Sequence, residues 1–306
     1  MKITSIETIP VIVPIDQTKA IVGGGGAHLE SPFLLLRVHT DEGLIGLGEV
    51  SGTMGWSGED QVTAAHIVHS YIEPVLIGRN PLDIRRHAAA MRGVVTGHAF
   101  TRAGIEIALW DLLGKAAGLP VYQLLGGRVR DEIPTVFPIT GKEPALAAEI
   151  ALWAVEQGFG TVKVKVGLDP DEDVERVRAV RTAVGDGVKV AADANGGWTT
   201  RAAIQTIPRL EDLGIVYMEQ PVRPLDVQRL AEVRAQVSVP IVADESVFSP
   251  EDAMAVVRAG AADVLSAYVG KAGGITGAAT IATIAEASGL GCTVGNNLEL
   301  GIGDAA

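Results

Sequence analysis

Two lysines alternate with valines in the stretch Thr161–Val166, TVKVKV. Successive side chains of a β-strand point to opposite faces, so Lys163 and Lys165 are predicted to share one face of a strand. Burying two ammonium groups inside a sheet costs free energy unless nearby anions or a polar cavity stabilise the charges. Each ammonium group also lowers the pKa of the other. The pattern therefore predicts a polar site in which one of the two lysines can act as a base.

Three later strands are each predicted to end on a carboxylate: Asp193, Glu219 and Asp244. Intervals of 26 and 25 residues separate them, which suits one strand-plus-helix unit each and brings the three strand ends together at one edge of a parallel sheet. Converging carboxylates need a cation, and oxygen ligands suit Mg²⁺, or Mn²⁺, better than zinc. One further unit along, after 27 residues, lies Lys271.

Each of these residues also has a purely structural interpretation. Asp193 or Asp244 alone could cap a following helix, and Lys271 could lie at the surface of a glycine-rich loop. Lys163 and Lys165 could be solvated on an edge strand, but a central barrel strand has no solvent edge. The recurrence of carboxylates in three successive units favours metal ligation.

These residues stand in five short motifs that follow one another in a fixed order: Lys163-x-Lys165, Asp193-Ala-Asn-Gly-Gly-Trp198, Glu219-Gln-Pro221, Asp244-Glu-Ser246 and Lys271. In this order the chain resembles the enolase superfamily, muconate lactonizing enzyme subgroup, over its whole length. The resemblance implies that Lys165 is the base or acid on one face of the substrate, with Lys163 its pKa-lowering neighbour. It implies that Lys271 is the partner on the opposite face.

Three further residues are candidates for supporting roles. The resemblance places Asn195 beside the site, with capping of the following turn as the alternative. Glu245 is predicted to orient the neighbouring ligand or the lysines. Glu299 is a candidate because it follows the last predicted strand.

The second part of the chain, residues 131–306, is predicted to be a TIM-like (β/α)7β barrel, because seven strands alternate with helices. The predicted strands lie near 133–139, 162–166, 188–193, 215–219, 240–244, 263–268 and 291–295. Thr199 and Ser249 are predicted helix starts, Ser249 as an N-cap with Pro250 at the first helical position. No eighth strand can be found, whereas the resemblance implies an eighth strand and a tail that returns to the N-terminal residues. We therefore expect the natural protein to be longer.

Residues 1–130 are predicted to form an α+β domain, and the resemblance implies that it is a capping domain. Strands are expected at 3–13, 33–39 and 44–50, and helices at 60–77 and 81–117. Glycine-rich loops lie at 21–27 and 51–58, but neither has the arrangement of a P-loop or a Rossmann turn. The resemblance makes them loops that close over the substrate, with Gly24 and Gly25 in the first. Trp56, in the second, is the candidate for touching the apolar part of the substrate, and a surface-exposed side chain without a role is the alternative.

Composition excludes several classes of partner. A net charge of −12 argues against nucleic acid and anionic membranes, and no run of eighteen apolar residues is found. The first residues lack the apolar core of a signal peptide, so we expect a cytoplasmic protein, and we expect a homo-oligomer. The single cysteine, Cys292, excludes a disulfide framework and is expected to be a small buried hydrophobe.

The resemblance and the residues together predict a Mg²⁺-dependent enzyme that moves a proton α to the carboxylate of a small substrate through an enediolate. The reaction expected first is a muconate-type cycloisomerisation. The alternatives are racemisation or epimerisation of an N-acylated amino acid or dipeptide, syn-elimination as in succinylbenzoate synthesis, and dehydration of a sugar acid or hydroxyproline. A silent binding barrel is disfavoured because every expected charged group is present, and a nicotinamide-dependent reductase lacks a clear phosphate site.

Overall fold

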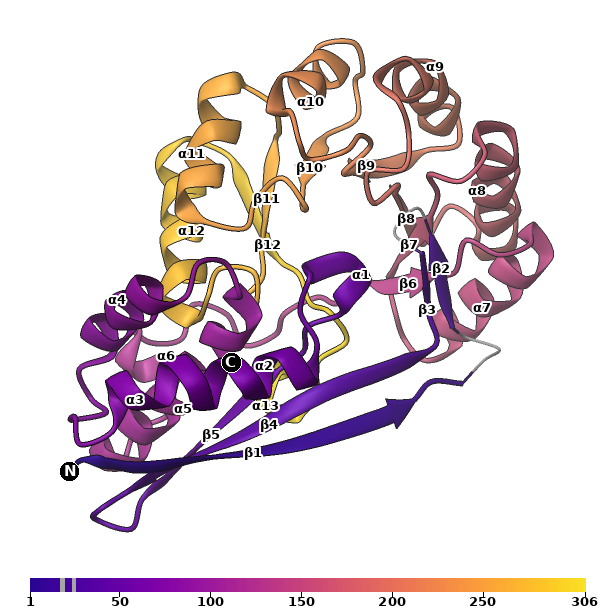
Figure 1. Cartoon of the computed structure of the whole chain (residues 1–306). Coiled ribbons are helices and arrows are strands. Elements are labelled where there is room, and N and C mark those ends of the chain that lie inside the picture. The colour runs from indigo at the N-terminus through magenta and orange to yellow at the C-terminus, as the bar shows by residue number, and fades with distance from the viewer. Residues whose placement is uncertain (17–19, 24–25) are drawn as a thin grey trace.

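The structure, a computed structural model of the 306-residue chain, describes residues 1–16, 20–23 and 26–306. Its N-terminal part combines an antiparallel sheet with helices, and its C-terminal part is a curled parallel sheet with helices on the outside (Figure 1). The predicted α+β and barrel-like architecture is therefore confirmed. The boundary predicted at 130/131 falls in the irregular stretch between the two parts, residues 125–136. Gly24 and Gly25 lie outside the described residues.

The N-terminal sheet has the order β1-β4-β5, formed by β1 (Ile3–Pro14), β4 (Glu30–Thr40) and β5 (Ile45–Val50). These are the three predicted strands. The sequence pattern missed a short hairpin between the first two, β2 (Ile21–Gly23) and β3 (Gly26–His28). The hairpin reaches the barrel, because Gly141 N–H donates to Val22 O at 2.6 Å and Val22 N–H donates to Thr140 Oγ1 at 3.2 Å.

Among the described residues of the N-terminal part, seven helical segments follow: α1 (Met54–Ser57), α2 (Gln61–Ile67), the π-helical turn η1 (Val68–Ile72), α3 (Glu73–Leu76), α4 (Ile84–Val94), α5 (Ala99–Ala117) and α6 (Val121–Leu124). The prediction of one helix over 81–117 is wrong. Gly97 and His98 adopt left-handed backbone angles, φ 72° and 48°, and a right-handed helix cannot pass through them. The segment 51–58, predicted as a loop, contains the single turn α1.

Helix α5 lies unusually close to β5 because glycines face each other. A Cβ on Gly48 would lie 2.0 Å from Gly104 O, and one on Gly46 would lie 2.2 Å from Ala108 O. A side chain at either strand position would push the helix away from the sheet. The helix that bridges the two parts of the molecule is thereby held at backbone-to-backbone distance from the N-terminal sheet.

The C-terminal sheet contains all seven predicted strands in parallel and in chain order. They are β6 (Phe137–Ile139), β7 (Thr161–Lys165), β8 (Lys189–Asp193), β9 (Ile215–Glu219), β10 (Ile241–Ala243), β11 (Val264–Ala267) and β12 (Gly291–Val294). The helices of this part are α7 (Pro144–Glu156), α8 (Pro170–Val184), α9 (Thr200–Glu211), α10 (Val227–Arg234), α11 (Pro250–Ala259), α12 (Ile275–Ala287) and α13 (Gly301–Asp304). Within the described residues β6 and β12 are the two end strands, and no ladder joins them. The expected eighth strand stays a prediction.

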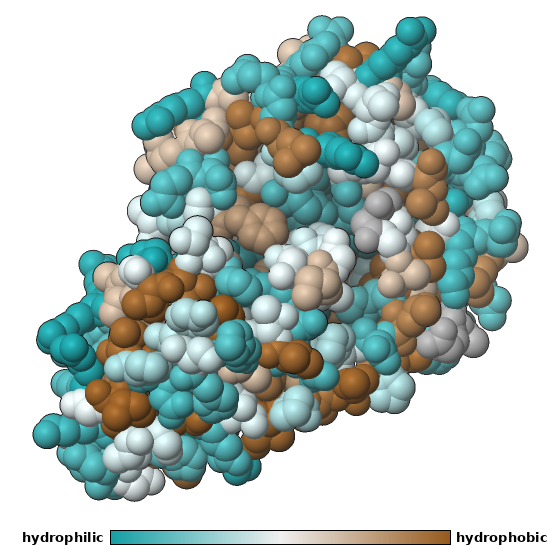
Figure 2. Space-filling model, in the orientation of Figure 1, coloured by the Kyte–Doolittle hydropathy of each residue, from teal (hydrophilic) through white to brown (hydrophobic). Residues whose placement is uncertain are grey.

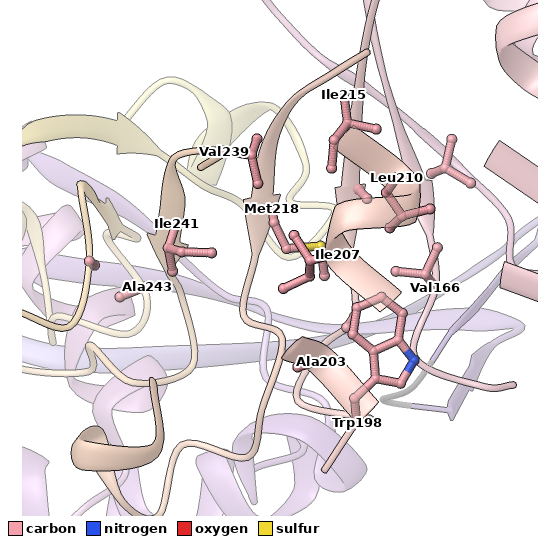
Figure 3. Close-up of a cluster of buried hydrophobic side chains, with 14 of the residues drawn as sticks. Val166, Trp198, Ala203, Ile207, Leu210, Ile215, Met218, Val239, Ile241 and Ala243 are labelled. Carbon is pink, nitrogen blue, oxygen red and sulfur yellow. The ribbon is translucent and has the colours of Figure 1, made fainter. Parts of the chain in front are cut away.

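The barrel core lies between the strands and the outer helices. Helix α9 presents Ala203, Ile207 and Leu210 to the sheet, where Met218 is fully buried (Figure 3). Burying a side chain of this size stabilises the fold by roughly 1.5–3 kcal/mol. The predicted helix starts are confirmed, since Thr199 Oγ1 accepts from Ala202 N–H and Ser249 Oγ from Asp252 N–H.

Cys292 departs from the prediction. It lies on β12, an end strand whose four residues are all exposed, and it is therefore not a buried hydrophobe. No helix in the described part of the chain is long and apolar enough to cross a membrane.

Candidate active site

The pairing of the parallel strands places the predicted lysine base and the predicted metal ligands side by side in one row. Lys165 on β7 is paired in register with Asp193 on β8, and Asp193 with Glu219 on β9. Asp244 directly follows β10, the next strand of the sheet. Here the strand ends face the N-terminal part, and the surface is hollowed between the two (Figures 1 and 2). The residues predicted as ligands and bases therefore meet at the carboxyl edge of the sheet.

Lys163 and Lys165 share one face of β7, as the alternation predicts, while Val162 and Val164 are fully buried in the core. Lys163 Nζ donates to Glu219 Oε1 at 2.8 Å and lies 3.3 Å from Asp193 Oδ2. Lys165 Nζ donates to the same Asp193 oxygen at 2.6 Å. The two ammonium groups thus converge on a shared carboxylate.

Lys271 is buried rather than at the surface, with none of its side chain exposed. Its Nζ donates to Asp244 Oδ1 at 2.5 Å and to Asp244 O at 2.6 Å. The same atom lies 4.1 Å from the centre of the Tyr268 ring, a cation–π contact. Lys165 and Lys271 are therefore bound to the first and the last of the three carboxylate-bearing units, with Glu219 in the unit between them.

The carboxylates and lysines change each other's pKa. Burial, together with the nearby Asp193 and Asp244 carboxylates, raises the pKa of Glu219 to about 8 despite the opposing effect of Lys163. Asp193 is equally buried, but Lys165 and Lys163 outweigh this and lower its pKa to about 2. Burial alone would lower the pKa of Lys163, yet Glu219 and Asp193 raise it well above its usual value. For Lys163, the predicted lowering by its lysine neighbour is therefore wrong, because the carboxylates dominate.

The donor set fits a hard divalent cation. Asp193, Glu219 and Asp244 offer only oxygen, and at most 4% of each residue is exposed. In the described residues no three such side chains already surround one metal position; each carboxylate instead holds a lysine ammonium. With Glu245 included and all groups ionised, four carboxylates face three ammonium groups. A divalent cation would offset this excess negative charge.

The supporting residues predicted from the sequence divide into two groups. Asn195, with a left-handed φ of 43°, accepts from Lys165 Nζ at 2.8 Å and donates to Glu245 Oε1 at 2.8 Å. Trp56 joins the same group, because its Nε1–H donates to Glu245 Oε1 at 3.2 Å. Glu299 does not: it accepts from Ser51 Oγ at 3.2 Å and from the Asn297 amide, and so ties the segment after β12 to the N-terminal part.

Sequence reasoning missed two residues of this site. Gln220 is buried with φ 33°, and its side-chain oxygen accepts from the backbone of Asp244 and Ser246, at 3.0 and 3.1 Å. Tyr268 is buried, and its hydroxyl donates to Asp244 Oδ2 at 3.3 Å. A signal for Tyr268 existed, since it follows β11 at the strand-end position that the ligands occupy in their own units.

Comparisons with known proteins agree with this arrangement. Residues 6–126 match the N-terminal domain of the mandelate racemase/muconate lactonizing enzyme family, and residues 145–306 match the enolase C-terminal domain-like family. An N-succinyl-L-Arg/Lys racemase from Bacillus cereus is 33% identical over all of this chain and 83% of its own length. Muconate cycloisomerase 1 from Rhodococcus opacus is 34% identical with the same coverage.

A solved structure, the dipeptide epimerase from Enterococcus faecalis V583 complexed with Mg and the dipeptide L-Leu-L-Tyr, superimposes with a TM-score of 0.94. It is 34% identical, and the match covers 99% of this chain and 85% of that one. Racemases, epimerases and cycloisomerases are thus similar to this chain to nearly the same degree. The chain belongs to the mandelate racemase/muconate lactonizing enzyme family and is an enzyme of the Mg²⁺-dependent enolase superfamily.

Proposed function

We propose that the protein is a racemase or epimerase that inverts the carbon next to the carboxylate of an N-acylated amino acid or a dipeptide. The observation that carries the proposal is the placement of two lysines on opposite flanks of the carboxylate row. Lys165 pairs with Asp193 on β8, and Lys271 with Asp244 after β10. Inversion requires a proton to leave one face of a carbon and another to arrive on the opposite face, which two flanking amines can do.

Each residue then has a defined task. Asp193, Glu219 and Asp244 would hold a divalent cation, which when bound supplies positive charge to stabilise the electrons left on the substrate carboxylate. Neutral Lys165 Nζ accepts the α-proton from one face, and the Lys271 ammonium donates its own proton to the same carbon from the other. The roles are exchanged in the reverse direction.

Lys163 is assigned a different task from that of its neighbour. The raised pKa of Lys163 keeps it protonated near neutral pH, so it is a fixed cation rather than a base. A fixed ammonium beside the metal carboxylates is suited to contact the substrate carboxylate.

The substrate class is inferred from the relatives. The similarity to an N-succinyl-L-Arg/Lys racemase and to a dipeptide epimerase complexed with L-Leu-L-Tyr supports an acylated amino acid or dipeptide. A second candidate is cycloisomerisation of a muconate, supported by similar identity to Muconate cycloisomerase 1. That reaction needs one lysine as acid and the other only as a cation.

Solvent deuterium exchange tests both candidates. The Mg²⁺-loaded enzyme is incubated in D₂O with N-succinyl amino acids, dipeptides and cis,cis-muconate, and α-deuterium is followed by NMR. We expect exchange with inversion in the wild type. We expect Lys165→Ala and Lys271→Ala each to abolish racemisation and to lose exchange from opposite enantiomers.

A lysine outside the site provides the control. Lys189→Ala, at an exposed position of β8, should behave as wild type. Lactone formation from muconate without exchange from any amino-acid substrate would establish the second candidate instead. Racemisation that persists in Lys271→Ala would refute the two-base assignment.

A further inference from the structure

Trp56 stands at the contact between the N-terminal part and the active site. Its ring stacks on Tyr268, with centroids 5.6 Å apart and an interplanar angle of 26°. It also packs edge-on against Phe100, at 5.8 Å, and lies 5.7 Å from Phe248. Trp56 therefore joins α1, α5 and the loops after β10 and β11 in one aromatic cluster.

One branch of contacts leads from Trp56 to Lys165. The indole N–H donates to Glu245 Oε1, and the same oxygen accepts from Asn195 Nδ2. The remaining amide atom of this asparagine, Oδ1, accepts from Lys165 Nζ. Three successive hydrogen bonds, 3.2, 2.8 and 2.8 Å long, thus run from the indole to the ammonium group.

A second branch leads from the same ring to Lys271. Tyr268, on which the indole stacks, lies under the Lys271 ammonium and also donates to Asp244. A cation–π contact depends on where the ring lies relative to the charge, so a shift of Tyr268 changes the surroundings of the lysine. The first branch depends on the indole N–H, whereas the second depends on the aromatic ring.

We propose that Trp56 is a positioning residue through which the N-terminal part sets the geometry of both lysines. It acts on Lys165 through Glu245 and Asn195, and on Lys271 through Tyr268. This inference is built on the proposed function. It assigns Trp56 a role in aligning the two amines that is separate from any contact with the substrate side chain.

Two substitutions separate the branches. Trp56→Phe keeps a ring for Tyr268 but removes the N–H, so exchange of the enantiomer deprotonated by Lys165 should slow on the order of tenfold while exchange on the Lys271 face changes less than about twofold. Trp56→Leu removes ring and donor, so exchange on both faces should slow. The faces are first assigned with the Lys165→Ala and Lys271→Ala variants.

Controls distinguish positioning from a general loss of structure. Trp153→Phe makes the same chemical change on α7, where the ring packs against Phe137, and should leave the ratio of the two exchange rates unchanged. A structural defect slows both faces together and lowers the melting temperature. Equal slowing of both faces in Trp56→Phe, or no change in either variant, would overturn the proposal.

A second measurement does not depend on the substrate. Reductive methylation with formaldehyde, followed by peptide mass spectrometry, gives the reactivity of each lysine relative to exposed Lys189. Trp56→Phe should change labelling of Lys165 alone, whereas Trp56→Leu should change labelling of Lys165 and also allow labelling of Lys271, which is fully buried in the wild type. Wild-type protein that exchanges no substrate would refute the proposed function, while unchanged labelling of both lysines in Trp56→Leu would refute the positioning role.

Discussion

Glu219 is the most strongly affected of the predicted ligands. Its carboxyl is buried near the carboxylates of Asp193 and Asp244, and it forms an ion pair with Lys163. Burial and the like charges raise its pKa to about 8, so near neutral pH the metal-free group holds a proton far more often than an ordinary glutamate does. A carboxyl must lose this proton before it can bind a cation.

We therefore predict that Mg²⁺ affinity of the metal-free protein rises with pH between about 6 and 8. Below the pKa of Glu219, each pH unit should change the affinity by up to about tenfold. Isothermal titration calorimetry measures this, and buffers of different ionisation enthalpy report the released proton. Glu219→Gln should bind more weakly and with a flatter pH dependence; wild-type affinity that is constant from pH 6 to 8 would contradict the assignment.

The identities of the site residues could be predicted from the sequence, but their protonation could not. Strand-end spacing alone pointed to Asp193 and Glu219 as neighbours. Burial raises the pKa of both groups. For Asp193 the nearby Lys165 and Lys163 outweigh burial, whereas for Glu219 the Asp193 and Asp244 carboxylates add to burial and outweigh Lys163. That difference depends on side-chain placement across separate barrel units, which no local pattern contains.

At the scale of elements, β7 is held in place by a buried ion pair on α8. Asp173 Oδ2 accepts from Gly167 N–H at 2.8 Å and from Trp198 Nε1 at 3.1 Å, while Asp173 Oδ1 accepts from Arg176. Arg176 also donates to the carbonyl oxygen of Lys165, at 3.4 Å. The helix thus fixes the backbone end of the strand that carries the two lysines.

Breaking this pair should cost far more than breaking a surface pair on the same helix. Arg176 is 2% exposed, so Arg176→Met leaves a buried carboxylate without its cation and should lower the free energy of unfolding by about 3–5 kcal/mol. Arg178 pairs with Glu175 and is more than half exposed, so Arg178→Met should cost only about 0–1 kcal/mol. Urea unfolding measures both, and equal costs would contradict this account.

The close contact of α5 with β5 predicts that alanine substitutions at two glycines will have opposite effects on stability. Gly48→Ala would place a methyl group 2.0 Å from Gly104 O and should destabilise the protein by roughly 1–3 kcal/mol or more. Gly93→Ala, at an exposed position of helix α4 with open space around it, should instead stabilise by about 0.5–1 kcal/mol. Thermal unfolding measures the sign of both changes in stability. A Gly48→Ala variant as stable as the wild type would show that the helix can shift.

The sequence predicted the barrel strands well, because a repeating pattern supports them. It predicted less well the features that depend on the conformation or position of a single residue. All seven barrel strands follow from the regular alternation of apolar runs and helix starts. The break before α5 depends on the left-handed backbone of His98, which no helix propensity signals. The exposure of Cys292 follows from the position of β12 at the end of the sheet. A run of apolar residues in a sequence does not indicate whether its strand lies in the centre or at the end of a sheet.

At the scale of the whole molecule, buried carboxyls make stability depend on pH. Burial raises the pKa of Glu245 and of Glu299 to about 7 each, and that of Glu219 to about 8, from an ordinary value of 4.5. Between these values the folded chain holds protons that the unfolded chain has lost. The stabilisation is complete below about pH 4.5 and is lost as pH rises through 7 to 8.

We predict that the metal-free protein loses of the order of a few kcal/mol of unfolding free energy between pH 5 and pH 8. Urea unfolding in a chelator measures this. Glu299→Gln should reduce the loss, because it removes one titrating group outside the predicted ligand set. Added Mg²⁺ should restore stability at pH 8 by binding the folded state. Stability that rises from pH 5 to pH 8 in chelator would contradict the prediction.

The segment after β12 is hydrogen-bonded to the N-terminal part, and these bonds can form only late in the synthesis of the chain. Asn297 donates to Ser51 O and to Thr53 Oγ1, and Leu300 N–H donates to Glu49 Oε1 at 2.7 Å. The first of these contacts joins residues 246 positions apart. At about 5–20 residues per second, a ribosome needs roughly 12–50 s to make the intervening chain. The segment that carries Trp56 therefore emerges long before its partners, and the two lysines can be aligned only after the segment that follows β12 has been synthesised.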